Sequence, residues 1–371
     1  MSMMLVIQLA IIALFLGSIP FAINAYKGSS LGLYRLSSIT IFITFDLILF
    51  GAFTRLTDSG LGCPDWPGCY GHSNPLLASE QISLAQSQMP FGPVTQSKAW
   101  IEMLHRYFAS GVGFLILSIA IITWINRQKL GQFVTSLSIG LFFLVCLQGA
   151  FGAFTVTLKL QPLIVTTHLL LALLLLGALV VLNHMTNPHQ AQEKKDPHYS
   201  ALYALGLMLV CCLQIFLGAW VSTNYAVLAC QDFPTCNGSL VPAMDFQNGF
   251  TFWRELGKTV SGEYLPIEAL IAIHWLHRVF AGIVFISITF FYFHYRKLSQ
   301  SGTSDWHLAL NKWLKVLASV AVLQFATGLS NVVLQWPLIA ALIHTGGAAL
   351  LIVATTKLLL LALPKPTIIN E

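Results

Sequence analysis

Long runs of hydrophobic residues, separated by shorter polar stretches, dominate this chain. A helix needs about 20 apolar residues to cross a bilayer, and several runs reach that length. The runs do not alternate polar and apolar residues as transmembrane β-strands do, so the pattern predicts helices. The expected fold class is an all-α integral membrane protein. The predicted spans are residues 4–23, 36–53, 100–125, 133–154, 163–183, 201–221, 267–293, 313–333 and 337–361.

The composition agrees with this interpretation. Of the 371 residues, 56% are hydrophobic and only 9% are charged, whereas a soluble domain carries about 25% charged residues. Most of the surface is therefore expected to face membrane lipid. The net charge of +5 does not form a basic patch with interleaved aromatic residues, so nothing in the sequence indicates a nucleic-acid partner.

The distribution of Lys and Arg predicts the orientation. The connections around residues 127–129, 194–195 and 296–297 are rich in these residues, whereas the long connections 54–99 and 222–266 hold few for their length. Positively charged connections stay in the cytoplasm, so the long loops and the N-terminus should lie outside. The N-terminal residues have neither the positively charged n-region of a signal peptide nor the Arg-rich composition of a mitochondrial transit peptide. We therefore expect a multi-pass protein of a bacterial cytoplasmic (inner) membrane.

The chain contains an internal duplication. Residues 51–71, GAFTRLTDSGLGCPDWPGCYG, resemble residues 218–238, GAWVSTNYAVLACQDFPTCNG, in their glycine, cysteine, aspartate and proline positions. Further matches follow downstream in the same order. They are His105-Arg106 with His277-Arg278, Leu147-Gln148 and Gly152 with Leu323-Gln324 and Gly328, and Pro162-Leu163-Ile164 with Pro337-Leu338-Ile339.

Each half should therefore be a four-helix bundle, giving a duplicated eight-helix core. An even number of spans gives both halves the same orientation, related by an axis along the membrane normal. The expected domains are 36–190 for the N-terminal half and 191–371 for the C-terminal half. Residues 1–35 would form an additional N-terminal transmembrane helix with a cytoplasmic turn, and the polar stretch 184–200 would link the halves.

Four histidines lie several residues inside the outer ends of their hydrophobic runs. At about 1.5 Å per residue, all four fall roughly 8–15 Å from the outer boundary. Ligating groups within a membrane are costly and usually functional, and one histidine from each of two facing helices can bind a heme iron from both sides. The alternative for each is a simple hydrogen bond to a neighbouring helix. The expected pairs are His105 with His168 and His277 with His344.

Polar neighbours distinguish the two pairs. Arg106 and Arg278 directly follow a histidine, where they could balance heme propionates or extend to the interface. Glu102 lies one turn before His105, and its equivalent in the second half is His274. A carboxylate in a low-dielectric pocket can accept a proton, or it can form an ion pair with Arg106. This asymmetry predicts a catalytic first half and an electron-transfer second half.

Each long outer loop carries two cysteines around an Asp-aromatic-Pro sequence, Cys63 with Cys69 and Cys230 with Cys236. An oxidising compartment permits disulfides, which would shape a cap over the heme pocket. A redox-active thiol pair remains open as the other interpretation. The absence of a CxxCH motif argues against covalent c-type heme, and no nucleotide-binding loop stands at a strand–helix junction.

Taken together, these motifs resemble the heme A synthase family, membrane enzymes that convert heme O to heme A for terminal oxidases. The resemblance covers roughly residues 36–361, and the paired loop cysteines match one subfamily. The additional span 4–23 departs from the eight-helix family pattern. The motifs are TRLTDSGLGCPDWPGC (54–69), EMLHR (102–106), TTH (166–168), CQDFPTC (230–236), AIHWLHR (272–278) and the helix of His344.

The resemblance implies that the halves have different roles. The first half would bind heme O as substrate, and the second would hold a heme b cofactor. The implied reaction is stepwise oxidation of a heme methyl group to a formyl group through hydroxylated intermediates. Glu102 matches the family's carboxylate implicated in this oxidation. The resemblance implies His105 and His168 near the substrate heme, and His277 and His344 as ligands of heme b. To these the neighbouring residues add Arg106 for the substrate heme, and Arg278 and His274 for heme b.

Other functions fit parts of the pattern. A diheme b-type cytochrome exchanging electrons, for example with quinol, would use the same histidines without needing the asymmetry between Glu102 and His274. A heme transporter could be built from parallel repeats, and a thiol oxidoreductase would need the loop cysteines alone. The expected partners are membrane lipid and heme O. Only the resemblance suggests a heme O synthase and a terminal oxidase assembly as partners, and the sequence does not indicate the electron acceptor.

Overall fold

The computed structural model describes residues 7–8, 11–15, 17–18, 32–188 and 198–363. Within these ranges the regular structure is helical, and pairing between extended residues is limited to three isolated bridges in loops. Eight helices in the described part of the chain are long and apolar enough to cross a membrane. This confirms the expected all-α integral membrane class.

Eight of the predicted spans coincide with these helices, which generally extend beyond the apolar runs. Of the additional span 4–23, residues 7–8, 11–15 and 17–18 are helical, and the rest lies outside the described residues, as does 189–197 of the linker. The spanning helices are α2 (Gly32–Leu56), α4 (Gln96–Ile125), α5 (Arg127–Thr157), α6 (Pro162–Met185), α7 (Ala201–Thr223), α9 (Ile267–Ser299), α10 (Asp305–Val333) and α11 (Leu338–Ala362); shorter helices are α3 (Ser79–Gln88), η1 (Ala226–Leu228) and α8 (Phe246–Gly249).

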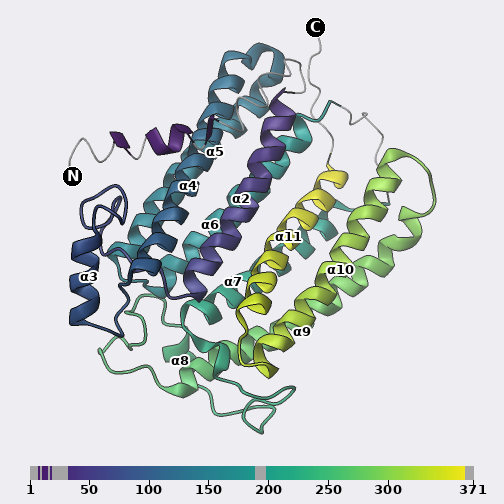
Figure 1. The fold of residues 1–371 in the computed structure, drawn as a ribbon. Helices are drawn as coiled ribbons and strands as arrows, with labels where there is room; N and C mark the ends of the chain where they lie inside the picture. The colour runs from purple at the N-terminus through teal and green to yellow at the C-terminus, as the bar shows by residue number, and fades with distance from the viewer. Residues whose placement is uncertain (1–6, 9–10, 16, 19–31, 189–197, 364–371) are drawn as a thin grey trace. The chain divides into compact units, whose positions relative to one another are not determined.

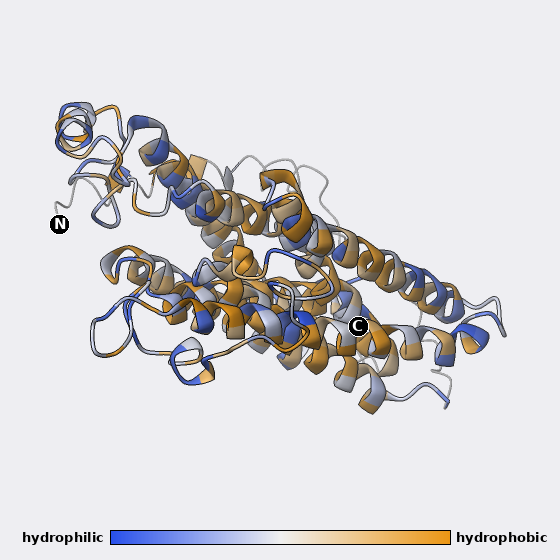
Figure 2. Cartoon of the chain, turned by 90° about the horizontal axis from the view of Figure 1, so that it is seen from below, coloured by the Kyte–Doolittle hydropathy of each residue, from blue (hydrophilic) through white to orange (hydrophobic). Residues whose placement is uncertain are grey.

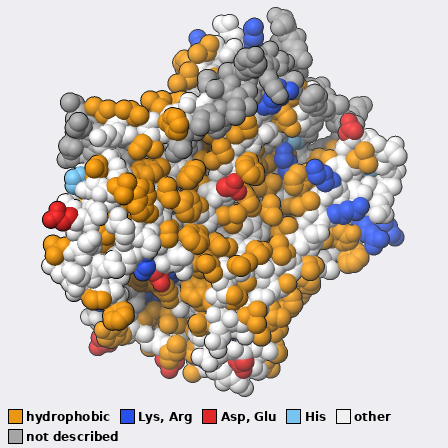
Figure 3. Space-filling model, in the orientation of Figure 1, with side chains coloured by type: hydrophobic (Ala, Val, Ile, Leu, Met, Phe, Trp, Pro, Cys, Tyr) orange, Lys and Arg blue, Asp and Glu red, His pale blue; other side chains and the backbone are white. Residues whose placement is uncertain are grey.

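The spanning helices are hydrophobic along most of their length, and the polar residues concentrate in loops and at helix ends (Figure 2). On the face seen in Figure 3, hydrophobic side chains cover the described helices and charged groups are sparse. Large apolar side chains such as Phe42, Phe143 and Ile286 are 65%, 66% and 69% exposed. A surface of this kind would drive aggregation in water, whereas acyl chains solvate it.

The helices group into two compact units. Helix α6 is divided between them, with its first turns in the second unit and its remainder in the first. The three sequence domains expected above stay a prediction. The described residues of the first unit lie within 7–160 and 174–188, and those of the second lie within 161–173 and 198–363.

In the first unit, α2 packs against α4, and α4 packs against α5 (Figure 1). The later part of α6 joins α2 through Asn183, whose side-chain amide donates to the hydroxyls of Ser37 and Ser38 at 3.0 and 2.8 Å. Helix α5 is interrupted near its start by Gly131, with φ of 81°. Glycine adopts this left-handed conformation without a Cβ clash.

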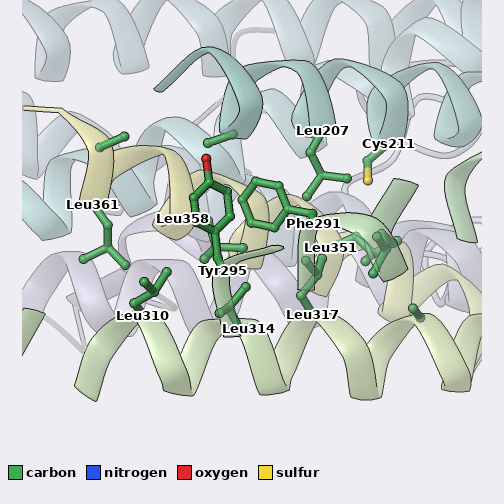
Figure 4. Close-up of a cluster of buried hydrophobic side chains, with 14 of the residues drawn as sticks. Leu207, Cys211, Phe291, Tyr295, Leu310, Leu314, Leu317, Leu351, Leu358 and Leu361 are labelled. Carbon is green, nitrogen blue, oxygen red and sulfur yellow. The ribbon is translucent and has the colours of Figure 1, made fainter. Parts of the chain in front are cut away.

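In the second unit, α7, α9, α10 and α11 form a four-helix bundle. Helices α9 and α11 each pack against both α7 and α10. A cluster of buried aliphatic and aromatic side chains fills the part of this bundle around Phe291 and Tyr295 (Figure 4). Tyr295 lies about 27 Å along α9 from His277, at 1.5 Å per residue. The hydrophobic cluster therefore leaves the opposite part of the bundle to the histidines.

Candidate functional site

His277 on α9 and His344 on α11 both lie in the second unit. Helices α7 and α10 each pack against both α9 and α11. Histidines on different helices of a bundle can hold a heme between them. The binding of a heme by His277 and His344 stays a prediction.

Neighbouring polar side chains contact the Nδ1 edge of both rings. For His344, Thr327 Oγ1 lies 2.9 Å from Nδ1, and the side-chain amide of Gln324 donates to the backbone oxygen at 2.8 Å. For His277, the amide nitrogen of Gln214 lies 3.1 Å from Nδ1 and 3.2 Å from the backbone oxygen. These contacts orient the rings, and they leave Nε2 as the nitrogen available to a metal.

Glycines allow the histidine helices to approach their neighbours. A Cβ added to Gly218 would lie 2.9 Å from Cε1 of His277, and one added to Gly51 would lie 3.0 Å from Nε2 of His105. Gly51 and Gly218 are matching positions of the duplication. Any larger residue would displace the imidazole, which gives a physical reason for a glycine at both places.

Glu102 is buried against the loop that follows α2, residues 57–78, with only 4% of its surface exposed. One carboxylate oxygen accepts a hydrogen bond from the backbone N–H of Cys63 at 2.8 Å. The other oxygen forms an ion pair with Arg106, one turn further along α4. The ion pair considered from the sequence is therefore present, and the backbone bond to Cys63 adds a contact that the sequence did not indicate.

Arg106 connects α4 to the same loop. Its Nη1 donates to the backbone oxygens of Asp65 at 2.9 Å and Gly68 at 2.6 Å, while its Nη2 faces Glu102. We call this arrangement, in which one guanidinium binds loop carbonyls and the residue one turn earlier, the first arginine clamp. The clamp fixes the loop over the carboxylate.

The second unit contains an equivalent clamp. Arg278 donates from Nη1 to the backbone oxygen of Asp232 at 2.7 Å and from Nη2 to that of Cys230 at 2.8 Å. Its Nε lies 3.1 Å from Nε2 of the buried His274. His274 thus occupies the place of Glu102, as the duplication predicted. The role of both arginines beside heme propionates stays a prediction.

Both loops are closed by disulfides, Cys63–Cys69 and Cys230–Cys236. Of the two interpretations of the cysteines, the structure therefore contains the bonded form. The aspartate inside each ring binds backbone N–H groups across it: Asp65 accepts from Gly71 at 2.7 Å, and Asp232 accepts from Gly238 at 2.9 Å. The hydroxyl of Thr235 and the backbone N–H groups of Gly238 and Asn237 lower the pKa of Asp232, because each hydrogen bond favours the ionised carboxylate.

His105 and His168 belong to different units. The ring of His105 meets Phe50 edge-on, with centroids 5.8 Å apart. His168 lies in the first turns of α6, where the neighbouring Thr166 shares a 3.0 Å hydrogen bond with Thr223 of α7. The binding of one substrate heme between His105 and His168 stays a prediction.

Sequence reasoning missed Gln214 and Thr327, which contact the histidines of the second unit. The available signal was a polar residue in an apolar run with no polar counterpart in the other half: Leu47 matches Gln214, and Phe151 matches Thr327.

The family model of COX15-CtaA, described as cytochrome oxidase assembly protein, matches residues 34–356. The chain belongs to this family. A heme A synthase of Shewanella oneidensis is 36% identical over 85% of this chain and 92% of its own length. Heme A synthases of Halalkalibacterium halodurans and Alkalihalophilus pseudofirmus are 26% and 27% identical over 80% of this chain and 86% of theirs. The resemblance carried by the sequence motifs is thus confirmed, and the COX15-CtaA match spans both disulfide loops and all four histidines.

Replacing Arg106 with Lys should loosen the first disulfide loop. A single ammonium group cannot reproduce the fork that binds several loop carbonyls and Glu102 together. We expect a water-soluble phosphine to reduce Cys63–Cys69 several-fold faster in this variant, as followed by alkylation and mass spectrometry. Arg127→Lys, at the start of α5 and away from the disulfide loop, is the matched control. Equal reduction rates in all three proteins would contradict the clamp.

Proposed function

We propose that this protein is a heme A synthase, an oxidoreductase that oxidises a methyl group of heme O to a formyl group. The observation that carries the proposal is the inequality of two duplicated sites within a member of the COX15-CtaA family. A buried carboxylate lies beneath one disulfide loop, and a buried imidazole takes its place beneath the other. One half is therefore suited to proton chemistry and the other to holding a redox group.

The first half is the proposed substrate site. His105 and His168, together or in turn, ligate the iron of heme O, and Arg106 lies on the propionate side. The methyl group to be oxidised is placed near Glu102. Each of two successive hydroxylations adds an oxygen at the level of water to that carbon and passes two electrons and two protons to an external electron acceptor. The resulting hydrate loses water to form the aldehyde of heme A.

Glu102 acts on the hydroxylated carbon as a proton acceptor. Its backbone bond from Cys63 and its ion pair with Arg106 hold the carboxylate in one place. General bases positioned in this way typically contribute 10²–10⁴-fold to a rate. Removal of a proton from the hydrate, followed by loss of water, is the step assigned to this residue.

The second half is the proposed site of a resident heme b. The residues present fit that group: His277 and His344 come from different helices of one bundle, and glycines lie against both rings. Gln214 Oε1, beside His277, is buried without a hydrogen-bond partner. A heme b bound there supplies one-electron redox chemistry. His274 and Arg278 lie on the loop side of His277 and close that site from outside.

The protein works within the membrane on a lipophilic substrate. Both sites and both disulfide loops are proposed to face the outside of a bacterial cytoplasmic membrane, because the basic connections lie at the opposite helix ends. A heme O synthase and a terminal oxidase assembly are the proposed suppliers and users of substrate and product. A diheme cytochrome or a heme transporter is not favoured, since neither needs the buried pair of Glu102 and Arg106.

Replacing Glu102 with Gln should retain substrate binding and stall oxidation. The amide keeps nearly the same volume but cannot accept the proton. We expect heme A yield in cells supplied with heme O to fall by about 10²-fold or more, with hydroxylated heme accumulating instead. Glu80→Gln, on exposed α3, is the matched control. Wild-type heme A yield from Glu102→Gln would rule out the assigned role.

Replacement of single histidines should affect the binding of heme b and of heme O separately. Replacing His277 or His344 with Ala should abolish the low-spin b-type spectrum of the purified protein while heme O binding persists. Replacing His105 with Ala should have the opposite effect. The measurement is optical and EPR spectroscopy with chromatography of the extracted hemes. Loss of both hemes in every variant, despite wild-type helix content and elution volume, would contradict the assignment of one heme to each half.

A further inference from the structure

The residues that contact the histidine Nδ1 atoms differ between the two halves. In the second half they are Gln214, beside His277, and Thr327, beside His344. The duplication places Leu47 and Phe151 at the equivalent positions of the first half. Leucine and phenylalanine side chains can contact an imidazole only through carbon. At these two positions the second half therefore has side chains capable of hydrogen bonding, and the first half does not.

The hydroxyl of Thr327 is placed to accept a hydrogen bond from His344. Its Oγ1 lies 2.8 Å from the backbone oxygen of Leu323, one turn earlier on α10, to which it can donate its own proton. In that arrangement the 2.9 Å contact with Nδ1 is made by a proton on Nδ1. This tautomer leaves the lone pair of Nε2 directed away from Thr327, as an iron ligand needs.

The amide of Gln214 can serve either tautomer of His277. Its Nε2 donates to the backbone oxygen of His277 at 3.2 Å and lies 3.1 Å from Nδ1, while its Oε1 is buried without a hydrogen-bond partner. A buried carbonyl oxygen without a donor costs about 1–3 kcal/mol. When Nε2 of His277 binds a metal, the proton moves to Nδ1, and a turn of the amide brings Oε1 to accept it.

We propose that Gln214 and Thr327 are positioning residues that make the second half a site of retained heme. Each accepts a hydrogen bond from the Nδ1–H of one axial histidine, which fixes the ring and increases the basicity of Nε2. Partners of this kind typically change metal affinity by 10–100-fold. They also stabilise the oxidised iron relative to the reduced iron, because a more basic ligand donates more charge.

The distribution of these residues matches the two roles under the proposed function, on which this inference rests in taking heme b as the resident group. A cofactor has to stay through many reaction cycles, whereas heme O must enter and its product must leave. Hydrogen-bonded axial ligands favour retention.

The test compares heme loss from full-length protein purified in detergent. Thr327→Val removes the acceptor with little change of shape, and Gln214→Leu introduces the residue found at the equivalent first-half position. With excess apomyoglobin as the heme acceptor, we expect heme b to leave each variant about 10-fold faster or more than wild type. EPR of the bound low-spin heme should shift, and its reduction potential should rise.

Thr355→Val is the matched control, because Thr355 is a buried α11 residue whose hydroxyl bonds only backbone oxygens of its own helix. It should lose heme at the wild-type rate. Thr327→Ser keeps the acceptor and should restore slow loss and the wild-type EPR signal, which a purely structural role of the threonine methyl would not predict.

Wild-type loss rates, EPR signals and potentials in both Thr327→Val and Gln214→Leu would overturn this inference and leave the proposed function intact. A wild-type protein that contains heme O or heme A but no heme b would overturn it together with the cofactor assignment. The two failures are therefore distinguishable in one set of preparations.

Discussion

The ion pair and hydrogen bonds of Arg106 are the interactions on which the candidate catalytic centre depends. A guanidinium and a carboxylate buried near the membrane interface are tolerated only when their charges and donors are satisfied. Here Arg106 binds Glu102 and the carbonyl oxygens of Asp65 and Gly68, and the N–H of Cys63 completes the shell of Glu102. Loop, helix and carboxylate therefore form one unit, and a disulfide closes the loop.

The same framework occurs twice, which makes the differences between the halves informative. Both halves have a glycine that lies against a histidine ring, an arginine directly after that histidine, and a disulfide loop whose aspartate accepts backbone hydrogen bonds. Some equivalent positions carry residues of different chemical character, and the buried Glu102 and His274 are one such pair, next to the disulfide loops. Phe151 and Thr327 are another, and the hydroxyl of Thr327 contacts His344. The duplicated scaffold thus places side chains at equivalent positions in the two halves, and the identity of individual buried residues makes their chemistry different.

Much of this was accessible from the sequence because a bilayer restricts the alternatives. Apolar runs of the required length had to become helices, and the repeat located Glu102, His274 and the four histidines in equivalent places. The contacts of Gln214 and Thr327 were not accessible, because an apolar run does not reveal which of its faces meets a neighbouring helix. The hydrogen bond from the backbone N–H of Cys63 to Glu102 could not be predicted either, because it joins residues 39 positions apart and depends on how the loop folds.

One half is proposed to bind a substrate heme and the other a cofactor heme. To distinguish them, the protein is purified from cells that also make heme O, and the non-covalent hemes are extracted and identified by chromatography and mass. We expect heme B together with heme O, a hydroxylated heme or heme A. Heme B alone, near two per chain, would rule out this division of roles and indicate an electron-transfer cytochrome.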